Sequence, residues 1–103
     1  MEEMSAQELR ERITSGDAPG GTYTLLDVRE PSEVAEEAID GSLRIPLGEV
    51  VARMGELDAS RETIVHCGGG TRSARAIEAL RAAGYEGRLV NFAGGMRGWN
   101  ASA

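Results

Sequence analysis

The chain has 103 residues, which matches one domain at the usual size of roughly 100–200 residues. Hydrophobic residues make up 41% of it and charged residues 27%, proportions that favour a folded globular chain over a disordered one. Aromatic residues account for only 4%, so aliphatic side chains must fill most of the core. We therefore expect a single domain over residues 1–103.

The formal net charge of −6 argues against a nucleic-acid partner, and no apolar run approaches the ~18 residues of a membrane span. This charge is unevenly distributed. Residues 1–60 hold 5 arginines against 14 acidic residues, whereas residues 61–103 hold 6 arginines against 3. Either the two halves complement each other when folded, or the second half contains a positive site for an anion.

The chain has one cysteine and one histidine. A lone cysteine forms no internal disulfide, and these two residues together are too few for a zinc site, which takes three or four protein ligands. The acidic start at 1–4 has neither the positive charge nor the apolar stretch of a secretory signal. We therefore expect a cytoplasmic protein with no metal and no cofactor.

The first half predicts a helix, a strand and a second short helix. Ser5 and Glu8 match a capping box, and apolar residues then recur at helical spacing as far as Gly16. A loop rich in glycine follows. Residues 23–28 read as a strand with apolar side chains on both faces, and Pro31 is placed to open a short helix.

Strands and helices continue to alternate in the second half. The predicted elements are a strand at 43–45, an amphipathic helix over 47–54, a strand at 63–67, a helix over 71–83, a strand at 88–92, and a loop or broken helical turn at 93–99. This order predicts an α/β fold in three layers, α/β/α, around a central, mainly parallel sheet of four to five strands. Functional loops then gather at the carboxyl ends of the strands, where Asp27, Cys67 and Phe92 lie.

The segment from Cys67 to Ser73 carries the strongest chemical signal. It joins a predicted buried strand to a helix, and three consecutive glycines allow its backbone N–H groups to turn inward as a cradle for an anion. The positive end of the following helix adds to this effect. Amides around the sulfur lower a thiol pKa, which makes Cys67 a candidate nucleophile. The alternative is a small apolar side chain that closes a core strand.

Two neighbours of Cys67 invite other roles. His66 suggests a Cys–His dyad, but adjacent residues of a strand point to opposite faces, so we reject the dyad and expect a packed core histidine. The hydroxyl of Thr71 is placed to donate to a bound anion or to the sulfur, or else to cap the helix.

The arginines in the first turns of the same helix oppose its dipole. Arg72 therefore needs a negative partner, either a carboxylate of the first half or a bound substrate, and both interpretations stay open. For Arg75 we expect a structural or solvent-exposed role.

Taken together, three motifs in order resemble a rhodanese domain of the single-domain thiosulfate sulfurtransferase kind. They are the residues at 26–33 (LDVREPSE), at 67–73 (CGGGTRS) and at 94–99 (GGMRGW). A weaker match lies at 39–46 (IDGSLRIP). Each motif is weak alone, but together they cover about residues 5–100 in register, which makes the resemblance specific.

The resemblance implies that Cys67 takes the outer sulfur of a donor such as thiosulfate, releases sulfite and holds the sulfur as a persulfide. A thiophilic acceptor, either cyanide or a thiol, then removes that sulfur. By the same resemblance, the loop amides stabilise the negative sulfur and bind substrate. The residues that supply them are Gly68, Gly69, Gly70, Thr71 and Arg72. Asp27 and Arg29 are expected to support the loop, and Trp99 and the turn at 94–95 to pack near its rim.

One departure concerns Ala38, which stands where the family often has a histidine; it alters the expected pocket rim or a partner surface. The single thiol means that an external acceptor must remove the sulfur.

A phosphatase or arsenate reductase of related fold is a rival function, but the loop of those enzymes has five residues between Cys and Arg, and this chain has four. Two further alternatives are a persulfide carrier that serves a protein partner in a sulfur relay and a non-catalytic binding module.

Overall fold

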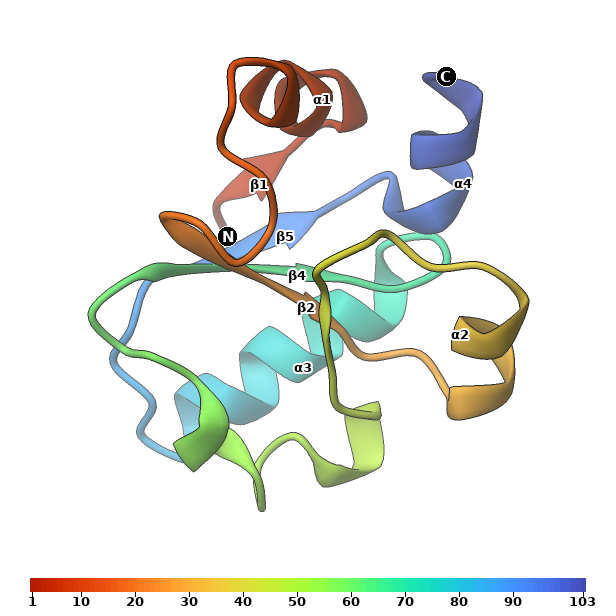
Figure 1. The fold of residues 1–103 in the computed structure, drawn as a ribbon. Helices are drawn as coiled ribbons and strands as arrows, with labels where there is room; N and C mark the ends of the chain where they lie inside the picture. The colour runs from red at the N-terminus through yellow and green to blue at the C-terminus, as the bar shows by residue number, and fades with distance from the viewer.

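The computed structural model describes residues 1–103, in which five strands and four α-helices follow one another (Figure 1). The strands are β1 (Glu3–Met4), β2 (Tyr23–Asp27), β3 (Leu43–Arg44), β4 (Glu62–His66) and β5 (Leu89–Phe92). The α-helices are α1 (Ala6–Thr14), α2 (Pro31–Glu36), α3 (Thr71–Ala82) and α4 (Gly95–Ala101). Two 3₁₀ helices, η1 (Leu47–Glu49) and η2 (Met54–Glu56), lie between β3 and β4.

The strands form one sheet in the order β1-β5-β4-β2-β3, and every pairing in it is parallel. The predicted α/β fold with a parallel sheet of four to five strands is therefore confirmed. Strand β1 is the one that the sequence analysis did not predict. It has two residues, Glu3 and Met4, opposite Asn91 and Phe92 of β5, and a segment this short carries no alternation of apolar and polar residues.

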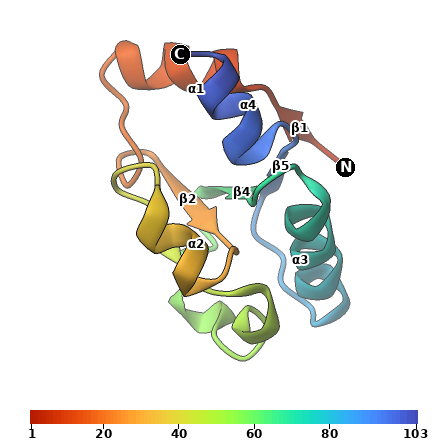
Figure 2. The ribbon, with the colours of Figure 1, turned by 90° about the vertical axis from the view of Figure 1, so that its right-hand side faces the viewer.

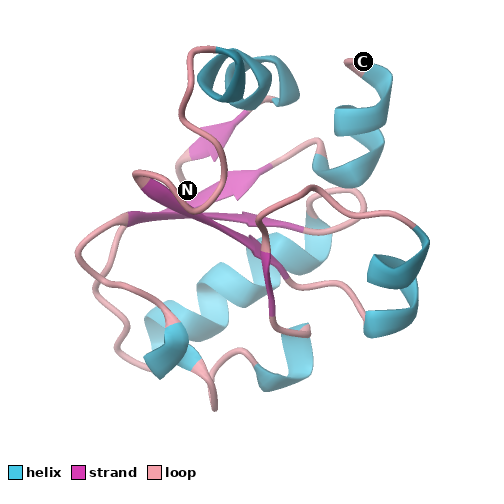
Figure 3. Cartoon of the chain, in the orientation of Figure 1, coloured by secondary structure: helices cyan, strands magenta, loops and turns pink.

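Helices cover both faces of the sheet, as expected for a parallel sheet. Helices α1 and α4 lie on one face, and α3 with the two 3₁₀ helices lies on the other (Figures 1 to 3). Successive strand residues divide between two hydrophobic clusters. Leu25 and Ile64 pack on the α1 side, whereas Leu26 and Val65 pack on the α3 side.

The helix predicted over 47–54 is wrong. The apolar spacing is present, but the segment forms η1 and η2 with turns between them. Gly48 and the β-branched pair Val50 and Val51 are poor helix formers, and only Val50 of this pair is buried. The segment still contacts the core through Val50, Leu47 and Met54, but from 3₁₀ helices and turns rather than from one helical face.

The loop or broken turn expected at 93–99 contains helix α4. Its glycines disfavour a helix in isolation. The first amides of α4 donate to carbonyl oxygens of the loop after β4, and Met96 is buried in the core, so tertiary contacts stabilise the helix. None of the helices in the structure has the length and apolar composition to cross a bilayer.

Candidate active site

The side chain of Cys67 receives hydrogen bonds from the loop that links β4 to α3. Its Sγ accepts the backbone N–H of Gly70 at 3.1 Å and that of Ser73 at 3.4 Å. Both donors lie around one atom because the loop turns back on Cys67, with α3 starting at Thr71 directly after it. This is the arrangement that stabilises a thiolate or another negative sulfur.

The three glycines of this loop have different roles. Gly70 alone has a positive φ, 95°, and a Cβ there would overlap the carbonyl oxygen of Ala93. Gly68 and Gly69 lie outside the left-handed region, and an added Cβ would meet only arginine side chains. The conformation that aims the amide at Sγ therefore requires glycine at position 70 in particular.

Helix α4 holds the loop from the other side. The N–H of Met96 donates to the carbonyl oxygen of Cys67 at 2.8 Å, and the N–H of Arg97 donates to that of Gly68 at 3.1 Å. Gly95, with a φ of 57°, packs so closely on this peptide that an added Cβ would lie 2.6 Å from the oxygen of Cys67. The third sequence motif thus fixes the first peptide of the loop.

A buried polar chain lies behind the sulfur. The Sγ of Cys67 is 3.5 Å from the hydroxyl oxygen of Ser73, and this hydroxyl donates to Oδ1 of Asn91 on β5 at 2.6 Å. Burial of the thiol raises its pKa, but hydrogen bonds from Ser73 and from the amides of Gly69 and Gly70 outweigh burial, so the pKa of Cys67 is lowered. The sequence analysis assigned no role to Ser73 or Asn91. The signal that could have identified them is Asn91 itself, a polar residue within the otherwise apolar strand β5.

The sulfur is covered in this structure. Cys67 is 1% exposed and packs within the hydrophobic cluster on the α3 side, so it combines the predicted cradle of amides with the burial of a core cysteine. A cavity of about 240 Å³ lies next to the loop, and Gly68, Arg72 and Arg97 are among its lining residues. Two amides therefore point to the sulfur, but Cys67 itself does not line the cavity.

Arg72 lines the cavity beside the loop and forms an ion pair with Glu33 of α2. Its Nη1 and Nη2 lie 2.5 and 2.9 Å from the two carboxylate oxygens. The hydrogen bonds from Arg72 lower the pKa of Glu33 to about 2. The partner of Arg72 is thus a carboxylate of the acidic first half. Thr71 is exposed, and its hydroxyl makes no hydrogen bond to the sulfur or to the helix.

Asp27 and Arg29 form a buried ion pair at the carboxyl end of β2. Nη2 of Arg29 lies 2.8 Å from Oδ2 of Asp27 and donates to the carbonyl oxygen of Glu37 at the same distance. The pair therefore holds the β2–α2 connection and the end of α2. It makes no hydrogen bond to the Cys67 loop, and its nearest link to that loop is the carbonyl oxygen of Glu33, which accepts from Nη1 of Arg29 at 3.4 Å.

His66 lies on the opposite side of β4 from Cys67, in agreement with the rejection of a dyad. Its ring is fully buried and packs edge-on against Phe92, with 5.9 Å between ring centroids. Nε2 is 3.5 Å from the carboxylate of Asp27. Burial lowers the pKa of His66, so the ring is neutral at pH 7.

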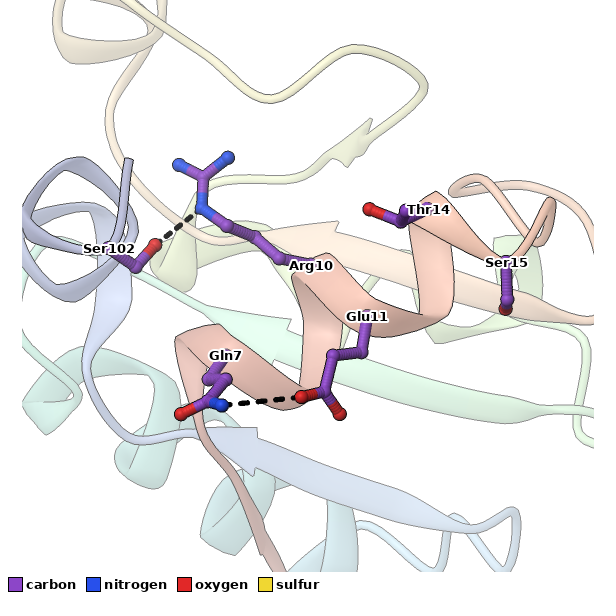
Figure 4. Close-up of a pocket in the computed structure, with 6 residues that line it drawn as sticks. All are labelled: Gln7, Arg10, Glu11, Thr14, Ser15 and Ser102. Atoms are coloured by element: carbon purple, nitrogen blue, oxygen red, sulfur yellow. Dashed lines mark hydrogen bonds between the residues drawn. The ribbon is translucent and has the colours of Figure 1, made fainter.

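Other parts of the surface are less suited to chemistry. The depression on α1 shown in Figure 4 is lined by polar side chains, among them Arg10, whose Nε donates to Ser102. Trp99 packs against Arg10 and the α1-side cluster rather than against the Cys67 loop. Ala38 lines an apolar cavity of about 320 Å³ next to Trp99. No group of three His, Cys, Asp or Glu side chains is arranged to hold a metal ion.

Comparisons with known proteins point to one family. The family described as the rhodanese-like domain matches residues 5–102. A sulfurtransferase of Allochromatium vinosum is 31% identical over 97 residues, covering 94% of this chain and 86% of the relative. YrkF of Bacillus subtilis, provisionally named a sulfur carrier protein, is 33% identical over 97 residues; the match covers 94% of this chain but 50% of YrkF. The crystal structure of a rhodanese-like domain protein from Staphylococcus aureus superposes with a TM-score of 0.84 at 26% identity, covering 96% of this chain and 91% of that one.

Proposed function

We propose, from the premise that this chain belongs to the rhodanese-like domain family, that it transfers sulfane sulfur through a persulfide on Cys67. The donor in this proposal is a small sulfur-bearing anion such as thiosulfate, and the acceptor is cyanide or a thiol. The observation that supports it best is the pair of backbone amides, from Gly70 and Ser73, directed at Sγ.

In the first step, the thiolate of Cys67 attacks the outer sulfur of thiosulfate. A sulfur–sulfur bond to Sγ forms, the sulfur–sulfur bond of thiosulfate breaks, and its electron pair leaves with sulfite. In the second step the acceptor attacks the terminal sulfur, giving thiocyanate from cyanide, and the thiolate of Cys67 is regenerated. The amides that lower the thiol pKa stabilise negative charge on sulfur before and after each step.

The burial of Cys67 adds a requirement to this cycle. Because Cys67 is 1% exposed, a donor reaches Sγ only when the side chains above the loop move aside. Arg72 and Glu33 are the residues that we expect to move, because their side chains are about one-third exposed and no main-chain hydrogen bond of the loop depends on them. In this proposal the loop residues 68–72 bind the substrate, and Asp27 and Arg29 support the loop indirectly, by holding the β2–α2 connection.

A second candidate function is that of a persulfide carrier which passes sulfur to a protein partner in a sulfur relay. The relative YrkF, named as a sulfur carrier and about twice as long as the matched region, favours this candidate. The intermediate on Cys67 is the same in both, so they differ only in the acceptor. We place either activity in the cytoplasm, where reducing conditions keep a lone thiol free.

The test is to incubate the protein with thiosulfate and to measure its intact mass, then to add cyanide and measure thiocyanate. We expect one added sulfur on the wild type, none on Cys67→Ser, and thiocyanate from the wild type alone. Circular dichroism of Cys67→Ser checks that the fold is retained. Turnover by Cys67→Ser equal to that of the wild type would overturn the assignment. Sulfur uptake with negligible thiocyanate would favour the carrier.

A further inference from the structure

Three arginines line the cavity next to the Cys67 loop, and two of them are already paired. Arg29 is bound to Asp27, and Arg72 is bound to Glu33. The third, Arg97, is exposed, and its side chain forms no ion pair and no hydrogen bond in the structure. Arg97 is therefore the cation at the mouth of this cavity whose N–H donors are free to bind a ligand from solution.

The guanidinium group of Arg97 lies directly over the loop. The backbone N–H of Arg97 donates to the carbonyl oxygen of Gly68, which fixes its position relative to Cys67. A Cβ built on Gly69 would lie 3.7 Å from Nη1 and 3.9 Å from Cζ of Arg97, so the charged end of the side chain lies on the glycine at the middle of the loop.

The opposite wall of the mouth has the opposite charge. Glu36 of α2 and the adjacent Glu37 line it, and the carboxylate of Glu37 accepts a hydrogen bond from Asn100 at 3.0 Å. An anion that enters the mouth is repelled from the α2 wall and attracted to the α4 wall. The only unpaired positive group on that wall is Arg97.

We propose that Arg97 is the anion-recognition residue of this site and that it holds the charged oxygens of the sulfur donor while the donor's outer sulfur faces Cys67. This inference rests on the proposed function and deepens it. The planar guanidinium group offers parallel N–H donors that fit the oxygens of a sulfonate or a carboxylate. Donors that carry such a group are therefore preferred over neutral persulfides of similar size.

The test compares two alkylating reagents that differ in charge, iodoacetate and iodoacetamide, in their reaction with Cys67. The ratio of their rates cancels differences in thiolate fraction and in rim opening, because both affect the two reagents equally. We expect Arg97→Gln to lower the iodoacetate-to-iodoacetamide ratio by about fivefold at low salt, and Arg97→Lys to restore most of it. We also expect the effect to shrink in about 1 M salt, where the Debye length is short.

Arg75→Gln is the matched control, because it removes the same charge from an exposed arginine on α3 that also lacks a partner. An equal fall in the ratio for Arg75→Gln and Arg97→Gln, or no fall for either, would overturn the inference. With thiosulfate as donor, Arg97→Gln is expected to raise KM and to leave kcat nearly unchanged.

The alkylation ratio separates this inference from the proposed function. If thiosulfate adds no sulfur to Cys67 but the ratio still depends on Arg97, the proposed reaction fails and anion recognition stands. If sulfur is added but the ratio does not depend on Arg97, the reaction stands and the inference fails. If neither reagent modifies Cys67 of the wild type, both are overturned, because the thiol is then out of reach.

Discussion

Replacing Gly70 by alanine is expected to destabilise the loop that carries Cys67, whereas the same change at the adjacent Gly69 should be tolerated. Gly70 has a φ of 95°, and an added Cβ would overlap the carbonyl oxygen of Ala93, which belongs to the backbone and has little freedom to move. At Gly69 the nearest atom to an added Cβ is Nη1 of Arg97 at 3.7 Å, an ordinary contact with a flexible side chain.

The size of the effect follows from these two contacts. A left-handed conformation costs a residue with a Cβ about 1–2 kcal/mol, and overpacking against fixed atoms adds about 1–3 kcal/mol. Gly70→Ala should therefore lower the free energy of unfolding by about 2–5 kcal/mol. For a domain of this size that corresponds to a fall in Tm of at least about 8 °C. Gly69→Ala restricts the unfolded chain without strain and should change the free energy by less than about 1 kcal/mol.

Two measurements decide the matter. Urea unfolding gives the stability of each variant, and the pH dependence of alkylation by iodoacetamide gives the thiol pKa. Because the amide of Gly70 lies 3.1 Å from Sγ, its displacement in Gly70→Ala should raise the pKa of Cys67. The pKa should change far less in Gly69→Ala. Equal stabilities and equal thiol pKa values for the two variants would refute the assignment of the cradle to the backbone at position 70.

Three other predictions concern the buried and half-buried charges. Asp27→Asn leaves the guanidinium of Arg29, 4% exposed, without its counter-charge, and urea unfolding should show a loss of about 3–5 kcal/mol. The pKa of His66 is lower in the folded state than in the unfolded state, so as the pH falls His66 takes up its proton first in the unfolded chain. The stability should therefore decline as the pH falls below about 6.5, by up to about 1.4 kcal/mol per unit, and a His66→Gln variant should show a flat profile between about pH 6.5 and 5.5. Arg72→Ala should return the pKa of Glu33 from about 2 towards its usual value, and should cost less than about 1 kcal/mol because the ion pair is about one-third exposed. A larger loss in the same urea titration would mean that Arg72 braces the loop.

The sequence predicted the sheet because its strands are distinct apolar runs separated by glycine and proline. It also located the loop at 67–73, because glycines between a strand and a helix have few other uses. Failures occurred where tertiary contacts decide local structure. Helix α4 forms on glycines that disfavour it, since its first amides bind carbonyl oxygens of a loop far away in the chain.

Side-chain contacts between separate elements could not be predicted from the sequence either. Ser73 of α3 meets Asn91 of β5 because α3 packs against β5, and no local pattern in the sequence encodes that packing. The same holds for Arg72: a carboxylate of the first half or a bound substrate was its possible partner, and the position of α2 selects Glu33. The residue types were informative, but their pairing depends on how the elements pack.

The uneven charge of the chain had two interpretations, complementary halves or a positive site in the second half, and the structure gives each of them a part. Ion pairs Arg72–Glu33 and Arg88–Glu2 join the basic half to the acidic half, as the first interpretation predicts. What remains is a small number of unpaired arginines, and of these Arg97 lies over the loop of Cys67. The chain as a whole has a net charge of −6, so only a local positive charge can attract an anionic donor. Carboxylates already neutralise Arg29 and Arg72 beside the loop, which leaves Arg97 as the residue that selects for anionic donors.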